Sequence, residues 1–173
     1  VSVKLKGGCI HHDNGFLGAA TYANAEERRI RKLKEAGYNA VRMAHHPMGK
    51  RLLEACDKYG MLVMDEFTDT WGNKGNSYDY GYYFSEWWRK DLINMVRKDY
   101  NHPCVILYSI GNEIPQTGSN LSAGIGRKLV ETIRTIDNTR YITNSINALL
   151  SVLKQIGEFS EFEPKDIPEG EIN

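Results

Sequence analysis

A carboxylic acid that follows an apolar segment is the feature of this sequence best placed to do chemistry. Residues Cys104–Tyr108 form a continuous apolar run, and Gly111, Asn112 and Glu113 come shortly after it. The length and branching of the run are typical of a strand buried on both faces. In a barrel of alternating strands and helices, the side chains at the C-terminal ends of the strands carry out the chemistry. We therefore predict that Glu113 transfers a proton in catalysis; the alternative is an ordinary polar turn that caps the next helix.

Polar side chains also follow the other apolar segments. Because parallel strands present their C-terminal ends at one mouth of a closed barrel, we expect these side chains to converge there. Adjacent residues on an extended segment point to opposite faces, so one member of each adjacent histidine pair is expected to face the pocket. The residues concerned are His11, Asp13, Arg42, His45, His46, Asp65, Glu66, Asn112, Glu113 and Asn144.

The elements that position these residues alternate between strand and helix. Apolar residues at helical spacing, with glycine stops at Gly37 and Gly60, separate the apolar runs. This alternation predicts an α/β fold with a parallel sheet built from right-handed crossovers. We expect a partial (β/α)8 TIM barrel with about the first five strands, since eight such units take about 250 residues. The expected strands are Val3–Ile10, Tyr38–Met43, Met61–Met64, Cys104–Tyr108 and Tyr141–Ser145, and the expected helices lie around Asn24–Gly37, Leu52–Gly60, Trp87–Tyr100 and Leu129–Ile136.

An open doubly wound sheet is the alternative architecture. It would account for five strands without a cut barrel, but its usual Gly-rich phosphate loop after the first strand is absent from the sequence. We therefore expect residues 1–148 to form the N-terminal part of a barrel. Residues 149–173 are expected to form a helix and then a flexible tail or insertion rich in Glu, Pro and Gly.

Composition and charge favour a neutral partner. The 22 basic and 22 acidic side chains cancel, which gives no electrostatic reason to expect nucleic acid or an anionic membrane. Neutral polymers such as sugars fit better. Cys9, Cys56 and Cys104 lie far apart and are expected to be buried thiols. No apolar stretch of about 18 residues and no secretory signal pattern is present, and the sequence does not distinguish the cytoplasm from the periplasm.

Five short segments, taken in order, resemble the catalytic barrel of glycoside hydrolase family 2, which contains β-galactosidases, β-glucuronidases and β-mannosidases. The resemblance implies retaining cleavage of a terminal β-linked sugar, with β-galactosidase first and β-glucuronidase or β-mannosidase as alternatives. It implies Glu113 as the general acid/base, Asn112 at the sugar 2-hydroxyl and Arg42 beside the nucleophile. His11 and His45 match positions that line the sugar site. The segments are Lys6-Gly7-Gly8 to His11-His12-Asp13, Val41-Arg42-Met43-Ala44-His45-His46-Pro47, Asp57-Lys58-Tyr59-Gly60 followed by Asp65-Glu66, Asn101-His102-Pro103 and Gly111-Asn112-Glu113.

The chemistry of these residues suits the same reaction. Retaining hydrolysis needs two carboxyl groups about 5–5.5 Å apart, one to protonate the leaving oxygen and one to attack the anomeric carbon. Glu113 suits the acid, and Arg42 would keep a second carboxylate ionised. Asn112 both donates and accepts, as a sugar hydroxyl requires. Asp65 and Trp71, which follow the third apolar run, complete the predicted substrate-binding residues, with Trp71 as the aromatic platform.

The second carboxylate is expected to be missing from this chain. The resemblance places the nucleophile at the end of a seventh strand, and Glu161 follows Glu113 too soon for three more strand–helix units. We expect Glu161 to be an exposed loop residue and the fragment to be inactive alone. Its predicted partners are a carbohydrate substrate and the remaining barrel and accessory β-sandwich domains of a parent protein, with a homo-oligomer left open.

Two other function classes stay open. One is a carbohydrate-binding relic that keeps the pocket without turnover, and the other is a metal-dependent barrel hydrolase. Metallohydrolases of the amidohydrolase type place one residue between two histidines of the first strand, whereas His11 and His12 are adjacent. The loop after Glu66 also lacks the acidic and histidine ligands that bind magnesium in some β-galactosidases. No metal and no other cofactor is therefore predicted.

Overall fold

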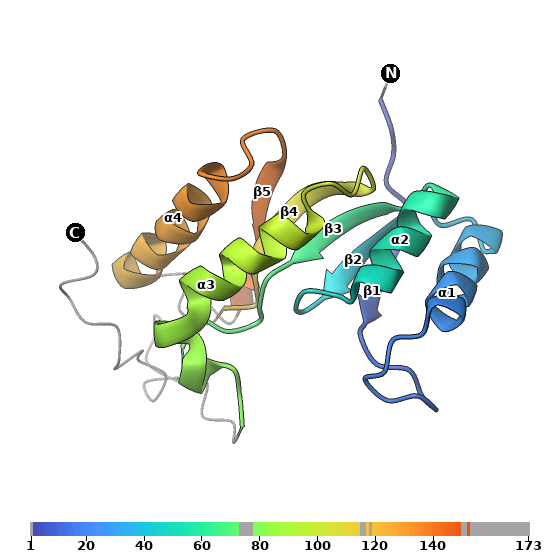
Figure 1. Cartoon of the computed structure of the whole chain (residues 1–173). Coiled ribbons are helices and arrows are strands. Elements are labelled where there is room, and N and C mark those ends of the chain that lie inside the picture. The colour runs from blue at the N-terminus through green and yellow to red at the C-terminus, as the bar shows by residue number, and fades with distance from the viewer. Residues whose placement is uncertain (1, 73–77, 115–116, 118, 150–151, 153–173) are drawn as a thin grey trace.

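Strands and helices alternate along the whole described part of the chain. The computed structural model describes residues 2–72, 78–114, 117, 119–149 and 152 (Figure 1). None of the helices in these ranges combines the length and apolarity needed to cross a bilayer. The elements are β1 (Gly7–His11), α1 (Ala23–Glu35), β2 (Ala40–Ala44), α2 (Lys50–Tyr59), β3 (Leu62–Glu66), α3 (Gly81–Asp99), β4 (Val105–Asn112), α4 (Asn120–Arg134) and β5 (Tyr141–Ser145).

The strands form one parallel sheet in the order β1-β2-β3-β4-β5. Pairing aligns Gly8 with Val41 across β1 and β2, and Tyr108 with Ile142 across β4 and β5. Crossovers of one hand between successive neighbours place the helices on one face of such a sheet, and Figure 1 shows α1–α4 on that face. A doubly wound sheet would reverse its strand order at a switch point, and the described strands show no reversal. The partial (β/α)8 barrel is therefore confirmed.

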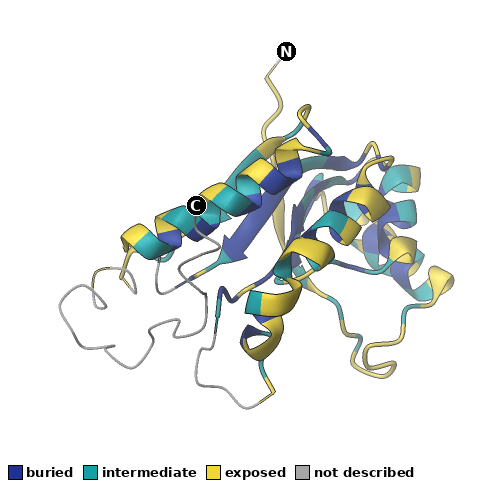
Figure 2. Ribbon diagram, turned by 60° about the vertical axis from the view of Figure 1, so that its left-hand side comes forward, coloured by how far each residue is buried: buried dark blue, intermediate teal, exposed yellow. Residues whose placement is uncertain are grey.

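The core lies between the sheet and the helices. Each helix contributes at least one fully buried aliphatic side chain, namely Ile30 from α1, Leu53 from α2, Leu92 from α3 and Leu129 from α4. Burial of one such side chain stabilises the fold by about 1.5–3 kcal/mol. Figure 2 shows buried residues on the strands and on the inner sides of the helices, with exposed residues facing outward. The hydrophobic stripes of the sequence therefore mark the helix faces that position the sheet.

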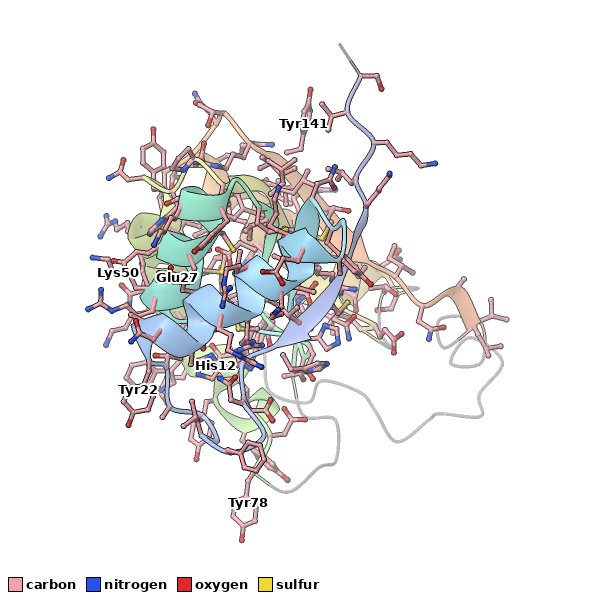
Figure 3. The ribbon with its side chains drawn as sticks, turned by 90° about the vertical axis from the view of Figure 1, so that its right-hand side faces the viewer. His12, Tyr22, Glu27, Lys50, Tyr78 and Tyr141 are labelled. Atoms are coloured by element: carbon pink, nitrogen blue, oxygen red, sulfur yellow. The ribbon has the colours of Figure 1, made fainter. Side chains whose placement is uncertain are left out.

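Ionic contacts join the helices on the outer surface. Oε1 of Glu27 in α1 accepts hydrogen bonds from Lys58 Nζ and Tyr59 Oη of α2, each at 2.7 Å. Figure 3 shows Glu27 on α1, on the helix side of the sheet. Exposed pairs of this kind contribute little to stability because solvent and salt screen them, so the packed core dominates the stability.

Two glycines are required by the backbone. Gly60 ends α2 in the left-handed region with φ of 64°, where a side chain would be strained. Gly7 allows β1 to approach β2, because a Cβ at Gly7 would lie 2.4 Å from the carbonyl oxygen of Ala40. Both positions help to set how β1 and β3 enter the sheet.

β4 is longer than the apolar run that predicted it. The strand continues past Tyr108 through Ser109 to Asn112. Ser109 is fully buried, and its Oγ donates to Glu66 Oε2 at 2.7 Å. A buried polar residue is tolerated in a strand when its hydrogen bond is satisfied. The strand therefore carries its polar end further into the mouth of the barrel than its hydrophobicity indicates.

Three helix starts also differ from the expected ones, and one of them is that of α4, which begins at Asn120 and not near Leu129. α3 begins at Gly81, where the backbone N–H donates to Asp79 Oδ1 at 2.9 Å, and not near Trp87. α1 begins after Tyr22, so Asn24 lies inside the helix and does not cap it. Local hydrogen bonds at helix ends decide these boundaries, and an apolar stripe does not report them.

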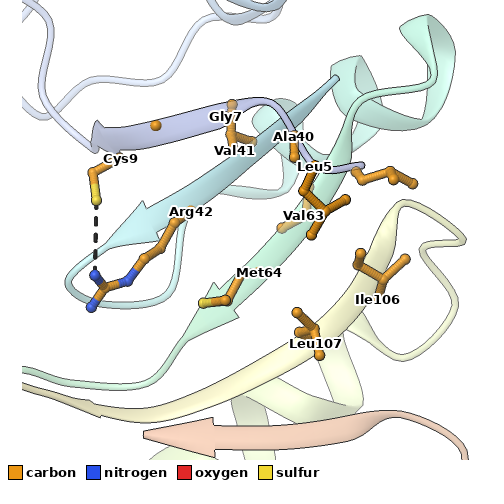
Figure 4. A pocket seen from close by; sticks show the side chains of 12 residues that line it. Leu5, Gly7, Cys9, Ala40, Val41, Arg42, Val63, Met64, Ile106 and Leu107 are labelled. Carbon is orange, nitrogen blue, oxygen red and sulfur yellow. Dashed lines mark hydrogen bonds between the residues drawn. The ribbon is translucent and has the colours of Figure 1, made fainter. Parts of the chain in front are cut away.

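The second face of the sheet carries no helix of the described part of the chain. It contains a hollow of about 300 Å³ lined by residues of β1 to β4 and by Leu5. Figure 4 shows Val41, Met64 and Leu107 lining the hollow, with Arg42 reaching toward Cys9 at one end. In a barrel this face is the interior. The predictions for the segment 149–173, including Glu161, lie outside the described residues except at Leu149 and Val152.

Candidate active site

A buried carboxylate, Glu66, is the centre of a polar cluster at the C-terminal ends of β2, β3 and β4. Its side chain is 0% exposed. Oε2 accepts from Arg42 Nε at 2.9 Å, from Arg42 Nη2 at 2.6 Å and from Ser109 Oγ at 2.7 Å. Oε1 lies 2.6 Å from His45 Nδ1. These contacts satisfy both oxygens and pair the charge, as burial of a carboxylate requires.

Arg42 connects this cluster to the end of β4. Its Nη2 donates a second hydrogen bond to Asn112 Oδ1 at 2.7 Å. Because arginine has no acceptor, the contact assigns the amide, with the oxygen toward Arg42 and Nδ2 directed elsewhere. Among the described residues Nδ2 has no hydrogen-bond partner, so its N–H groups are left for a ligand such as a sugar hydroxyl.

Histidines from β1 and β2 border the cluster. The rings of His11 and His45 are edge to face, with centroids 5.6 Å apart and planes at 85°. His12 and His46 form a second pair, also 5.6 Å apart. Arg29 of α1 donates to the carbonyl oxygens of His11 and His12 and fixes the end of β1. The structure thus brings His11 and His45 together beside Glu66, as the convergence of the strand ends predicts.

Glu113 lies at the same end of the sheet, one residue beyond β4. Its φ of 48° is unusual for a residue with a side chain. Its backbone N–H donates to the carbonyl oxygen of Ser145 in β5 at 2.7 Å, and its side chain is exposed. The carboxyl group makes no hydrogen bond to the described residues, so it is available to a substrate at the mouth.

Asp65 does not join the cluster. It points to the helix face of β3, is 0% exposed and lies near Asp99 of α3. Burial, together with the negative charge of Asp99, raises the pKa of Asp65 well above its usual value. The structure therefore contradicts the prediction that Asp65 lines the pocket. The next residue, Glu66, takes that place because side chains alternate along a strand.

Trp71 is also placed differently from the prediction. It is 3% exposed, and its Nε1 donates to the carbonyl oxygen of Ile110 at 2.9 Å. Its ring packs on Gly126 of α4, where an added Cβ would lie 3.3 Å from the indole. Trp71 therefore fills a slot between β4 and α4 and leaves no open face for a sugar. A loop position predicted exposure, but the missing side chain at Gly126 makes room for the ring.

The family of this chain follows from comparison with the sequences of known protein families. The sequence profile of "Glycosyl hydrolases family 2, TIM barrel domain" matches residues 2–167. The chain belongs to glycosyl hydrolase family 2. Family membership and the partial barrel agree with each other, because the matched region contains all five strands.

Relatives within family 2 include more than one activity. A β-galactosidase from Bacteroides ovatus is 45% identical over 120 residues, covering 69% of this chain and 14% of the relative. A β-glucuronidase from Bacteroides fragilis is 29% identical over 147 residues, covering 83% of this chain and 21% of the relative. A solved family 2 structure from Bacteroides cellulosilyticus matches with a TM-score of 0.83 and 50% identity, covering 85% of this chain and 19% of that chain. This chain therefore spans less than a quarter of the length of these family 2 proteins.

The sequence placed Glu66 among the residues expected at the mouth but did not identify it as the centre of the cluster, and it gave no indication of Ser109, the contact of Glu66 from β4. The signal that identifies Glu66 is the sheet register, in which Arg42 of β2 pairs with Met64 of β3. Glu66 lies two residues after Met64 and therefore shares its face. Ser109 gave no signal, because it lies within an apolar stretch and its role depends on contact with β3.

A second group of possible metal ligands lies at the opposite end of the family 2 sheet. Asp57, His102 and Cys104 offer ligand atoms within 4.8 Å of one another. His102 Nδ1 lies 2.6 Å from Asp57 Oδ2, and the backbone N–H of Cys104 donates to Asp57 Oδ1 at 2.9 Å. A hydrogen bond with Cys56, together with burial, raises the pKa of the Cys104 thiol. The group therefore connects α2 to β4 through hydrogen bonds, with a protonated thiol that is a poor metal ligand.

Proposed function

We propose that this chain carries the acid/base half of the active site of a retaining exo-β-glycosidase, with β-galactosides as the first substrates. The observation that carries the proposal is the polar cluster of Arg42, His45, Glu66 and Asn112 at one mouth of a family 2 barrel, directly before Glu113. The β-galactosidase from Bacteroides ovatus supports the choice of sugar.

Glu113 supplies the proton in this proposal. In the first step it protonates the oxygen of the leaving group while a second carboxylate attacks the anomeric carbon and forms a glycosyl-enzyme intermediate. In the second step the Glu113 carboxylate accepts a proton from water as the water oxygen attacks the anomeric carbon and the bond to the second carboxylate breaks, so the sugar leaves with its original anomeric configuration. Its exposed position beyond β4 gives a substrate access to it.

The neighbours of Glu113 hold the sugar and the second carboxylate. Asn112 Nδ2 donates to a sugar hydroxyl, because Oδ1 is occupied by Arg42. Among the described residues, Arg42 Nη1 donates only to Cys9 Sγ, at 3.9 Å, so its second N–H group is left for an anion. An attacking carboxylate beside this guanidinium would remain ionised.

The second carboxylate is proposed to come from a part of the protein beyond this chain. The chain covers 14% of the Bacteroides ovatus relative and contributes five strands to the sheet. The barrel architecture of the family requires further strands to close around the hollow in Figure 4. We therefore expect the chain alone to be inactive.

The complete reading frame that carries this chain is the material for the test. We expect Glu113→Gln to lower kcat on an aryl β-galactoside by about 100-fold or more, as for loss of a general acid. We expect azide to restore part of the activity of Glu113→Ala on a substrate with an activated leaving group. Proton NMR of the released sugar is expected to show retention of configuration. Full activity in Glu113→Gln would refute the proposal. Sugar binding without turnover by the wild-type protein would favour a sugar-binding relic, and inhibition by a chelator would favour a metal-dependent hydrolase.

A β-glucuronidase is the second candidate. The Bacteroides fragilis relative of that name matches 83% of this chain. Arg42 and the neighbouring histidines would also suit the carboxylate of a uronic acid. Paired assays with the aryl β-galactoside, β-glucuronide and β-mannoside of the same leaving group separate the candidates by kcat/KM.

A further inference from the structure

We infer that Glu66 is a positioning residue that holds Arg42 and His45 as one preoriented unit. Through Ser109 it also ties this unit to β4, the strand that leads to Glu113. The inference rests on the proposed function, and it adds a role for a residue that contacts the substrate only through its neighbours.

Side-chain contacts of Glu66 connect three strands at the mouth of the barrel. Arg42 comes from β2, Glu66 from β3 and Ser109 from β4. Both carboxylate oxygens are used, Oε2 by three donors and Oε1 by His45. Glu66 is 0% exposed, whereas Arg42 and His45 are 22% and 26% exposed. The buried residue therefore supports two partly exposed side chains that can reach a ligand.

The orientation of Arg42 follows from this carboxylate. A guanidinium has five N–H donors in a rigid fork. Glu66 binds Nε and one hydrogen of Nη2, and Asn112 Oδ1 binds the other hydrogen of Nη2. Nη1 is then directed toward the hollow, where it makes a long contact of 3.9 Å to Cys9 Sγ and keeps one N–H group without a partner among the described residues for an incoming anion. Without the negative charge of Glu66, Arg42 would lose two of its three strong contacts.

The tautomer of His45 follows from the same carboxylate. An ionised carboxylate only accepts, so Nδ1 of His45 carries a hydrogen at 2.6 Å from Glu66 Oε1. Nε2 makes no hydrogen bond to the described residues and is left for a ligand. A glutamine at position 66 could donate to Nδ1 and release this constraint, because its amide has both donors and acceptors.

The test compares Glu66→Gln with Asp137→Asn in the complete protein. Asp137 is a matched control, because it is buried at 0% exposure and paired with Arg140 at 2.6 Å near the start of β5, away from the mouth. We expect Glu66→Gln to lower kcat by about 100-fold, the effect of misplaced catalytic groups, and Asp137→Asn to keep the wild-type kcat. Rates are expressed per active site, counted with a covalent glycosidase inhibitor, so that an unfolded fraction does not contribute.

A spectroscopic readout separates positioning from stability. Nitrogen-15 NMR of the imidazoles, assigned with a His45→Gln variant, is expected to show the Nδ1–H tautomer of His45 in wild type and a shift toward Nε2–H in Glu66→Gln. If Glu66→Gln does not fold, Ser109→Ala is used, and loss of this hydrogen bond to a charged group is expected to lower kcat by about tenfold.

Two outcomes would overturn the inference. One is a folded Glu66→Gln protein with wild-type kcat and an unchanged His45 tautomer. The other is an unfolded Glu66→Gln together with wild-type kcat in Ser109→Ala. If the wild-type protein cleaves no aryl β-glycoside, the proposed function fails, and the tautomer of His45 still decides whether Glu66 positions it.

Discussion

Two consecutive carboxyl groups on β3 have opposite surroundings because the strand turns them to opposite faces. Glu66 meets Arg42 and His45, whereas neither oxygen of Asp65 has a hydrogen-bond partner among the described residues. The negative charge of Asp99, which is itself paired with Lys98, also opposes ionisation of Asp65. Burial near a second carboxylate favours the neutral acid. One position along the strand therefore separates a paired carboxylate from a protonated one.

This contrast predicts that Asp65→Asn gains stability over wild type as the pH rises. Because the pKa of Asp65 is raised in the folded protein, the unfolded chain releases this proton near pH 4 while the folded chain keeps it. The stability that protonated Asp65 contributes is complete below about pH 4 and declines toward the folded pKa, by up to about 1.4 kcal/mol per pH unit. Asparagine has no such loss. Urea unfolding of both proteins between about pH 4 and pH 8 measures the difference, and a difference that stays constant with pH would contradict the prediction.

At the scale of the element, the end of β4 depends on a residue without a side chain. A Cβ at Gly111 would lie 2.8 Å from Ile114 Cγ1 and 2.9 Å from Asn144 Oδ1. Both distances are shorter than van der Waals contact, so the turn that carries Glu113 would have to move. Gly111 therefore allows β4 and β5 to meet at the mouth, and the backbone bond from Glu113 to Ser145 depends on that approach.

Gly111→Ala is accordingly expected to lower kcat/KM by about 100-fold, the effect of a displacement of about 1 Å at a catalytic group. Gly15→Ala is the matched control, because an added Cβ at Gly15 meets nothing within 4 Å. Assays with an aryl β-glycoside measure the effect, and circular dichroism checks that both variants are folded. Equal activity in the two variants would show that the turn adapts without cost to the site.

The strands and their polar ends differ in how well the sequence alone predicts them. Apolar runs and glycine stops predicted all five strands and their order, because strands of a parallel sheet are rich in apolar residues and alternate with helices along the chain. The chemistry of Arg42 and Asn112 was visible because Arg42 is a charged residue near the end of the second run and Asn112 follows the fourth. The face of the sheet to which Asp65 points could not be predicted, because the residues of β3 before Asp65 are all apolar and have no alternation of polar and apolar residues that would distinguish the helix face from the barrel interior. The burial of Trp71 depends on Gly126, far away in the sequence and adjacent only after folding.

At the scale of the whole molecule, the sheet is covered on one face and hollow on the other. The helices bury the core on the first face, while Leu5, Met64 and Leu107 line a hollow of about 300 Å³ on the second. Apolar side chains in a parallel sheet are normally covered on both faces. The fold therefore carries an apolar surface that the rest of a closed barrel would cover.

The chain expressed alone is therefore expected to bind the apolar dye ANS more strongly than the complete protein does, because dyes of this kind report exposed apolar surface. Leu107→Glu places a charge in the hollow and is expected to remove most of this dye fluorescence from the chain. Tyr83→Glu is the matched control, because Tyr83 is 58% exposed on α3, away from the hollow. Size-exclusion chromatography of the same samples shows whether the open face also joins copies of the chain, as apolar patches commonly do. Dye binding that is equal in the chain and the complete protein, or that survives Leu107→Glu, would mean that the hollow is closed in solution.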